Sequence, residues 1–173
     1  MRTILLGVAA AGLIAGCTSD SAPPAEQAET VALLPGEYDI SAKIDSFRST
    51  DKATPATRAK VGDPPATRRA CVAAGGNMPV EAFADAGDLC TASSSYVRNG
   101  RLNLQLSCSR PGHGTVMQLA DGSFKADSFE AKLNTATYFT GSGDYAMTRS
   151  FTGKRVGECS AVPAKPETGK AKQ

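Results

Sequence analysis

The sequence of 173 residues contains no tryptophan, and aromatic residues make up only 6% of it. A strong excess of one charge is also missing, because 19 Lys and Arg against 17 Asp and Glu leave a formal net charge of +2. Such a balance does not indicate a nucleic-acid-binding protein. We therefore expect no nucleic-acid partner.

Histidine is almost absent as well. His113 is the single one, inside the Pro- and Gly-containing segment 110–114, where we interpret it as an exposed loop residue. Most hydrolytic triads use a histidine, and no nucleophile elbow, phosphate-binding Gly loop or paired-His motif occurs. We expect no cofactor, no metal and no enzymatic activity. An envelope enzyme that uses carboxylates or arginine stays open as the alternative, because folding can bring distant carboxylates together.

Long apolar runs are missing except at the N-terminus. Arg2 precedes the uncharged segment 4–15, which is too short to cross a bilayer, since a spanning helix needs about 20 residues. A basic start, a short apolar run and small residues before a cysteine are typical of an export signal. The run ends Leu13-Ile14-Ala15-Gly16-Cys17, which resembles the lipobox of bacterial lipoproteins.

This resemblance implies that residues 1–16 are a signal peptide and that the thiol of Cys17 is linked to diacylglycerol. Several acyl chains hold a protein at a membrane far better than one, so we expect a cell-envelope protein anchored through Cys17. Thr18 stands where an Asp would resemble an inner-membrane retention signal, which favours the outer membrane, facing the periplasm. An ordinary secretory signal or an uncleaved anchor is the alternative.

Two segments lack the apolar residues needed for a core. Residues 17–33 are rich in Ser, Ala, Pro and Glu, and residues 160–173 contain two prolines and three lysines. Such compositions favour disorder. We predict a flexible tether, a single domain at 34–159 and a disordered basic tail.

Apolar residues at every second position predict strands through most of the domain. We expect five or six antiparallel strands in sequence order, forming an all-β curved sheet or open barrel. The clearest segments are Gly36–Phe47, Arg68–Val72, Leu89–Val97, Arg101–Ser109 and the stretch from Tyr145 to Val156. Thr50–Thr67 contains three prolines and is predicted to be a long loop. Asn77 with Pro79 predicts one short helix that ends at Ala86.

The central strands are predicted from a less regular pattern. Thr115, Met117 and Leu119 are expected to face inward, and Asp121-Gly122 to form a tight turn. The alternation of apolar and polar residues then shifts by one residue at Ser128, which a β-bulge would explain.

Besides Cys17 there are four cysteines, which is an even number in an oxidising compartment and predicts two disulfides. Facing residues of a hairpin have a constant sum, so a three-residue turn at 98–100 places Cys90 opposite Cys108. A two-residue Asn99-Gly100 turn would place Cys90 opposite Ser109 instead. We favour the bridge, which leaves Cys71 to pair with Cys159. A four-thiolate zinc site is the weaker alternative, because no two cysteines are closely spaced.

Several of these landmarks together resemble the bacterial family called domain of unknown function 3617. Pro35-Gly36-Glu37-Tyr38-Asp39 is similar to its opening motif, and the segment Gly153 to Cys159 is similar to its closing motif. Tyr38 stands where the family often has Trp. The resemblance covers about Leu34 to Cys159 and implies a small secreted or envelope β domain. It transfers no activity and no catalytic residue.

One charged residue breaks the alternation. Arg149 falls on the same face of its strand as Tyr145, Met147 and Phe151. Together with Tyr96 or Tyr145, it could bind an anionic headgroup or a carboxylate on a concave sheet. Strand twist or a sheet edge that lets Arg149 reach water is the alternative explanation. Our functional hypothesis is a non-catalytic binding or interaction module for a lipid, peptide or envelope protein.

Overall fold

The computed structural model describes residues 32–160. The predicted signal peptide, Cys17 and nearly all of the two predicted tails lie outside this range. Within residues 32–160, no helix combines the length and the apolar character needed to cross a membrane.

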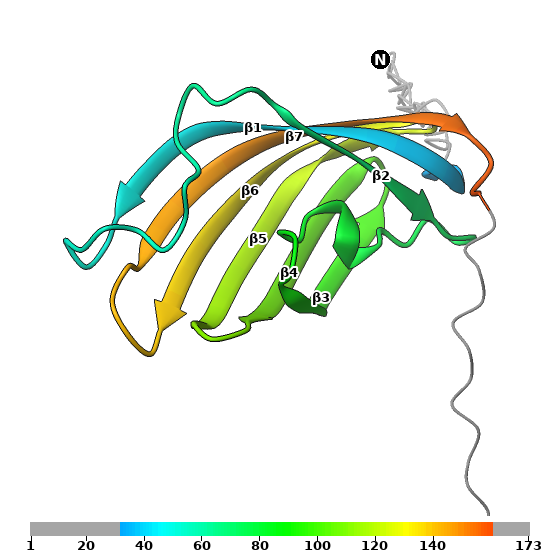
Figure 1. Ribbon diagram of the computed structural model, residues 1–173. Coiled ribbons are helices and arrows are strands. Elements are labelled where there is room, and N and C mark those ends of the chain that lie inside the picture. The colour runs from blue at the N-terminus through cyan, green and yellow to red at the C-terminus, as the bar shows by residue number, and fades with distance from the viewer. Residues whose placement is uncertain (1–31, 161–173) are drawn as a thin grey trace, which may run out of the picture.

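The domain is one antiparallel sheet of seven strands, which curls into a half-barrel (Figure 1). The prediction of an all-β curved sheet is confirmed, and the predicted number of five or six strands is wrong. The strands are β1 (Gly36–Ser49), β2 (Ala66–Val72), β3 (Leu89–Arg98), β4 (Arg101–Arg110), β5 (Gly114–Lys125), β6 (Ser128–Phe139) and β7 (Tyr145–Gly157).

The strand order is β2-β1-β7-β6-β5-β4-β3. The predicted meander is confirmed for β3 to β7, but the first two strands do not continue it in sequence order. β1 pairs with β7, and β2 folds back along the other side of β1. The long segment between β1 and β2 makes this return possible, and the chain then crosses to the far edge to begin β3.

The hydrophobic core lies on the inner, concave face. Tyr38, Ile40 and Ala42 of β1 and Leu102, Leu104 and Leu106 of β4 are buried there, as their alternation predicts. The apolar half of this face contains Phe129 and Phe151, which both contact Phe83.

The turn predicted at Asp121-Gly122 is wrong, because β5 runs through it. A Cβ on Gly122 would lie 2.0 Å from the carbonyl oxygen of Glu130, so glycine here allows two strands to approach closely. The turn follows at Ala126-Asp127, between the facing residues Lys125 and Ser128. This turn explains the shift in the apolar alternation, and the β-bulge predicted there is wrong. The prediction that Thr115, Met117 and Leu119 face inward is wrong, because all three are on the outer face. The inward residues of β5 are Val116, Gln118, Ala120 and Phe124.

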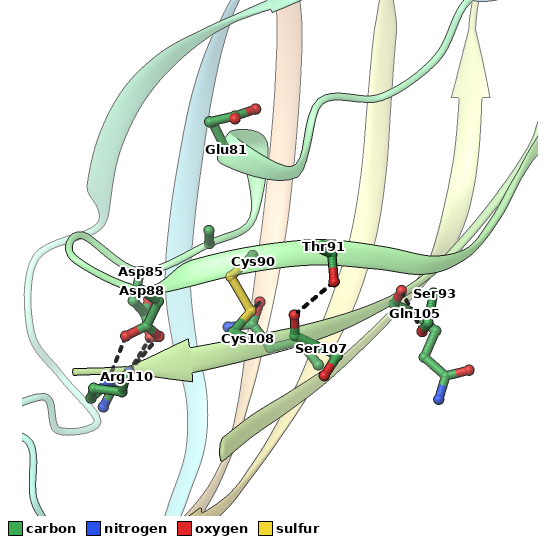
Figure 2. The surroundings of a disulfide bond; sticks show 12 residues. Glu81, Asp85, Asp88, Cys90, Thr91, Ser93, Gln105, Ser107, Cys108 and Arg110 are labelled. Carbon is green, nitrogen blue, oxygen red and sulfur yellow. Dashed lines mark hydrogen bonds and ion pairs between the residues drawn. A yellow bond between two sulfur atoms is a disulfide. The ribbon is translucent and has the colours of Figure 1, made fainter. Parts of the chain in front are cut away.

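In the β3–β4 hairpin the three-residue turn predicted at residues 98–100 is wrong, but the pairing of Cys90 with Cys108 that was predicted with it is confirmed. Asn99 and Gly100 have positive φ and form a two-residue turn, since Arg98 faces Arg101. Cys90 nevertheless faces Cys108, and their sulfurs are at disulfide distance (Figure 2). A β-bulge between Ala92 and Ser94 adds the one residue needed to reconcile the two.

The other cysteine pair is Cys71 and Cys159, also at disulfide distance. It joins the edge strand β2 to a residue two positions beyond the end of β7. Both predicted pairings are therefore confirmed.

The helix predicted from Asn77 to Ala86 is wrong. Only a 3-10 turn, η1 (Val80–Ala82), forms, with Pro79 before it in extended conformation. Contacts with the sheet outweigh the local preference: Phe83 is fully buried, and Arg68 of β2 donates hydrogen bonds to the carbonyls of Glu81 and Ala84. The segment thus covers part of the concave face.

Candidate functional site

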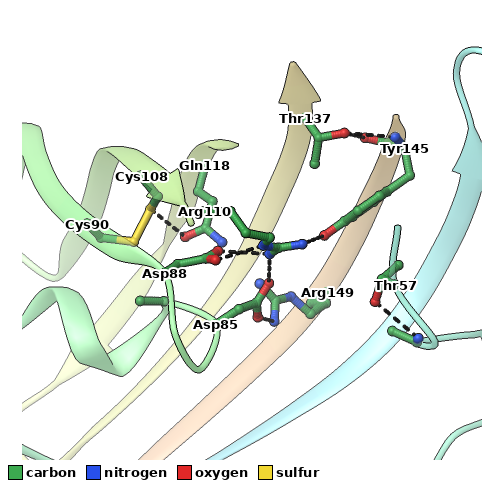
Figure 3. Close-up of polar contacts among 12 residues, drawn as sticks. Thr57, Asp85, Asp88, Cys90, Cys108, Arg110, Gln118, Thr137, Tyr145 and Arg149 are labelled. Atoms are coloured by element: carbon green, nitrogen blue, oxygen red, sulfur yellow. Dashed lines mark hydrogen bonds and ion pairs between the residues drawn. A yellow bond between two sulfur atoms is a disulfide. The ribbon is translucent and has the colours of Figure 1, made fainter. Parts of the chain in front are cut away.

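One end of the concave face is lined with polar side chains, most of which are buried (Figure 3). We call this set the polar end of the concave face. It consists of Arg110 of β4, Gln118 of β5, Thr135 and Thr137 of β6, and Tyr145 and Arg149 of β7. Burial of this many polar groups is costly unless each one finds a partner.

Arg110 has a full set of partners. Its Nε and Nη2 donate to the two carboxylate oxygens of Asp88 at 2.7 and 2.8 Å, and its Nη1 donates to the Tyr145 hydroxyl at 2.8 Å. The Asp88 side chain has no exposed surface. The hydrogen bonds to Asp88 raise the pKa of Arg110, so this guanidinium stays charged. Burial raises the pKa of Tyr145, so its hydroxyl stays protonated at neutral pH.

The hydrogen-bond partners of Arg149 are incomplete. Its Nη1 donates to Oδ1 of Asp85 at 2.5 Å, and its guanidinium carbon lies 5.4 Å from the centre of the Phe151 ring. Its Nε and Nη2 are buried and make no hydrogen bond with any residue of 32–160. These two nitrogens form the same edge of the guanidinium with which Arg110 binds Asp88.

Two more buried groups beside Arg149 lack partners. Nε2 of Gln118 and Oγ1 of Thr135 also make no hydrogen bond within the described range. Gln118 faces Thr135 in the β5–β6 register, and Thr135 is two residues from Leu133, which faces Arg149. The unpaired donors therefore gather on three adjacent strands.

The ion-pair network at this end contains more guanidiniums than carboxylates. Arg110 and Arg149 share Asp85, and Arg110 also binds Asp88. A third guanidinium, that of Arg68, lies near the Phe151 ring, with its central carbon 5.9 Å from the ring centre. Burial, and next the charge of Arg149, lower the pKa of Arg68. Within this network three guanidiniums therefore face two carboxylates. The carboxylate of Asp144 also lies at this end, but it accepts a hydrogen bond from the Thr137 hydroxyl and forms no ion pair with the three arginines.

Two grooves also cross the outer face of the sheet, with volumes of about 860 and 550 Å³. The larger one is lined by hydroxyl and charged side chains, among them Arg69, which pairs with Asp39 at 2.7 Å. Its charges are exposed and partly compensated. The buried unpaired donors make the concave face the stronger candidate for a binding site.

The model of the family described as "Protein of unknown function (DUF3617)" matches residues 33–159. The chain belongs to the DUF3617 family. No curated protein and no solved structure matches it.

The two motifs that resemble DUF3617 lie side by side in the fold. The opening motif begins β1 and the closing motif ends β7, with Tyr38 opposite Arg155. Arg155 donates from Nε to the carbonyl of Pro35 at 2.8 Å, and a Cβ on Gly36 would lie 2.4 Å from the carbonyl oxygen of Gly157. In this DUF3617 domain the motifs therefore join the first strand to the last, and they lie away from the polar end of the concave face.

The structure brings together only part of the predicted site. Arg149 and Tyr145 both contact the network of Arg110 and Asp85, as the hypothesis requires. Tyr96 does not, because the bulge in β3 turns it to the outer face, opposite Asn103. The alternative that Arg149 reaches water is wrong, since its side chain is only 7% exposed. His113 is an exposed turn residue of the DUF3617 domain, as predicted.

Sequence reasoning missed Asp85, Asp88, Arg110, Gln118 and Thr135. The two aspartates fall in a segment predicted as the end of a helix and the loop after it, so nothing assigned them a partner. Gln118 and Thr135 could have been found if the inward positions of β5 and β6 had been assigned correctly, because a polar residue at an inward position of a strand is unusual.

Proposed function

We propose that the chain is a lipid-anchored envelope protein and that its DUF3617 domain is a non-catalytic module that binds an anionic group. The anion, a carboxylate or a phosphate, is bound at the polar end of the concave face. The observation that supports this most directly is the unpaired Nε–Nη2 edge of the buried Arg149.

The chemistry of the donors selects the ligand class. Two parallel N–H groups on one guanidinium edge fit a carboxylate or phosphate bidentately, as the neighbouring pair of Arg110 and Asp88 does within the protein. Gln118 and Thr135 would add an amide and a hydroxyl donor to the same anion. An anion would also offset the excess of guanidinium charge.

Access to the site depends on Asp85. Its side chain is 24% exposed and lies at the margin of the otherwise buried cluster. Asp85 is held only by Arg110 and Arg149 among the side chains described. A ligand anion that takes over the contacts of Arg149 would therefore enter beside it. The same guanidiniums neutralise both carboxylates of the site, which disfavours an acid–base role.

Binding is tested with two probes, inorganic phosphate and decanoate, by calorimetric titration of the mature protein. The decisive variant is Thr135→Val, which removes an unpaired hydroxyl and no existing hydrogen bond. We expect unchanged or higher thermal stability and roughly ten-fold weaker binding of the preferred probe, because a charge-assisted hydrogen bond contributes about 1.5–3 kcal/mol.

Thr137→Val is the matched control, since the Thr137 hydroxyl already bonds Asp144 and the backbone of Tyr145. It should lower stability and leave binding within about two-fold of the wild type. Arg149→Lys should weaken binding as well, because lysine lacks the bidentate edge. Failure of both probes to bind the wild-type protein would contradict the proposal. Wild-type affinity in both Thr135→Val and Arg149→Lys would also contradict it.

The anchor is tested separately by growing cells with labelled palmitate. We expect label in the wild-type product and none in Cys17→Ser, which should also leave the membrane fraction. Processing that is insensitive to globomycin and a product without label would exclude the acylated cysteine while leaving the binding site untouched.

A further inference from the structure

Strand β3 forms an open edge of the half-barrel. One side pairs with β4, and no strand within residues 32–160 pairs with the other. Six consecutive residues, Thr91–Tyr96, are exposed. An edge of this kind offers free backbone N–H and C=O groups to another strand.

This edge lacks two of the usual protections. Natural edge strands avoid pairing through charged side chains, prolines, β-bulges or covering segments, and residues 89–97 contain neither a charge nor a proline, while the bulge between Ala92 and Ser94 is the one such feature of β3. The opposite edge, β2, contains the charged residues Arg68 and Arg69. The two edges of the sheet are therefore not equivalent, and β3 is the one suited to pairing.

The hairpin geometry indicates which backbone groups are free. The Cα atoms of Cys90 and Cys108 are 3.9 Å apart, as in a pair that is not hydrogen-bonded, so the N–H and C=O of Cys90 point away from β4. The pair that closes a two-residue turn is hydrogen-bonded, which applies to Arg98 and Arg101. Counting back from Arg98, the backbone groups of Val97 and Ser95 also point away from β4.

The bulge also places the two largest exposed side chains of β3 on one face. Leu89 and Tyr96 are seven positions apart and would lie on opposite faces of a regular strand. Because the bulge between Ala92 and Ser94 inserts one residue, both are on the outer face, and they are 69% and 45% exposed.

We propose that β3 pairs antiparallel with β3 of a second copy of this chain around a two-fold axis. In the register that fits, Leu89 faces Tyr96 of the partner subunit, Cys90 faces Ser95 of the partner subunit, and Thr91 faces Ser94 of the partner subunit. The two seven-stranded sheets then join into one continuous sheet.

This register satisfies both requirements of an antiparallel pair. The residues whose backbone groups are free, Cys90 and Ser95, face each other and exchange hydrogen bonds. The residues beside them face each other on the same side of the sheet, so each Leu89 contacts the partner's Tyr96, and symmetry gives this contact twice.

The choice of a second copy follows from this symmetry. In this register the two-fold axis passes between Ala92 and Ser93, so a charge near it would lie close to the same charge of the second copy. The middle of β3 is Ala92-Ser93-Ser94, small and uncharged. Pairing with a strand of another protein is the competing outcome. It would not require Leu89 at one end of β3 to match Tyr96 at the other end.

The test is the association constant of the full mature protein in detergent, measured by sedimentation equilibrium. We expect a dimer that Leu89→Lys weakens by roughly ten-fold or more, since it replaces both apolar cross-strand contacts. Leu119→Lys is the matched control: Leu119 is also an exposed leucine of the outer face, 43% exposed, but lies on the interior strand β5. It should leave the dimer unchanged.

A second variant pair tests the register itself. Tyr96→Glu alone should weaken the dimer, and Leu89→Lys combined with Tyr96→Glu should restore it, because each lysine then faces a glutamate of the partner. A monomer at every concentration, a dimer insensitive to Leu89→Lys, or co-purification of a different protein on this edge would each overturn the proposal. Unchanged melting temperatures verify that the variants fold.

Discussion

Arg110 holds Asp88 through two parallel hydrogen bonds, Nε to Oδ1 at 2.7 Å and Nη2 to Oδ2 at 2.8 Å. Arg110 ends β4 and Asp88 immediately precedes β3, so this pair closes the hairpin beyond the Cys90–Cys108 bridge (Figure 2). It also attaches the segment that covers the concave face to the sheet.

Arg110→Met should lower the free energy of unfolding by about 3–5 kcal/mol, because it leaves the buried carboxylate of Asp88 without its partner. Urea denaturation measures this. Arg69→Met is the matched control: Arg69 pairs with Asp39 but is 64% exposed, and the cost should be about 0–1 kcal/mol. The double variant Arg110→Met with Asp88→Leu should recover part of the loss. Equal costs for Arg110→Met and Arg69→Met would contradict the structural role.

Gly153→Ala should destabilise the fold by about 1–3 kcal/mol or more, since overpacking displaces neighbouring side chains. A Cβ at this position would lie 2.0 Å from the Phe129 ring, which packs directly on the backbone of β7. Gly157→Ala, on the same strand, is the control, because its Cβ would meet no described atom within 4 Å. Thermal unfolding of both variants measures the difference, and similar melting temperatures would show that Phe129 moves aside freely.

Removal of the two disulfides should have unequal effects. Cys71 and Cys159 are 88 residues apart, and Cys90 and Cys108 are 18 apart. In the chain-entropy model, the longer loop contributes about 4.5 kcal/mol and the shorter about 3 kcal/mol, both as upper values. Denaturation of the Cys71→Ser/Cys159→Ser and Cys90→Ser/Cys108→Ser variants tests the order. A greater loss from the hairpin pair would indicate that native-state contacts dominate.

Asp51 should make stability depend on acid pH. Its carboxylate accepts hydrogen bonds from the backbone N–H groups of Asp144, Ala53 and Gly143, which lower its pKa from 3.8 to about 2. The ionised form is therefore favoured by folding. Its stabilisation is fully present above pH 3.8 and is lost as the pH falls through about 2.

The measurement is urea denaturation between pH 5 and pH 2 in wild type and Asp51→Asn. We expect the free energy of unfolding to fall less steeply with acid in Asp51→Asn, because the amide does not titrate. Glu81→Gln, which removes an exposed carboxylate of η1, is the control and should keep the wild-type slope. An unchanged slope in Asp51→Asn would show that the link between the β1–β2 loop and the β6–β7 turn is not made by the ionised carboxylate.

Local pattern was enough for much of the fold. Alternation alone identified the inward residues of β1, β4 and β7, because a half-buried strand must present its apolar side chains at every second position. The constant-sum rule, applied with a three-residue turn, gave the pairing of Cys90 with Cys108, although the hairpin reaches this pairing through a two-residue turn and a bulge. Elimination then gave the pairing of Cys71 with Cys159.

Other features depend on neighbours that a single sequence does not reveal. The turn expected at Asp121-Gly122 is a close approach of β5 to β6, and glycine serves either purpose. The helix expected after Asn77 yields to the burial of Phe83 and to the hydrogen bonds of Arg68. In both cases a long-range contact outweighs a local preference of about 1 kcal/mol or less per residue.

The sequence by itself determined the alternation that makes this an all-β domain and the even number of cysteines that can cross-link it, because both can be read along one chain. Only the tertiary structure decided that Arg149 is buried with one guanidinium edge unpaired, that Asp85 is its partner, and that a bulge sends Tyr96 outward. Those outcomes depend on which strands become neighbours, and long-range pairing, unlike periodicity, leaves no trace in the residues nearby.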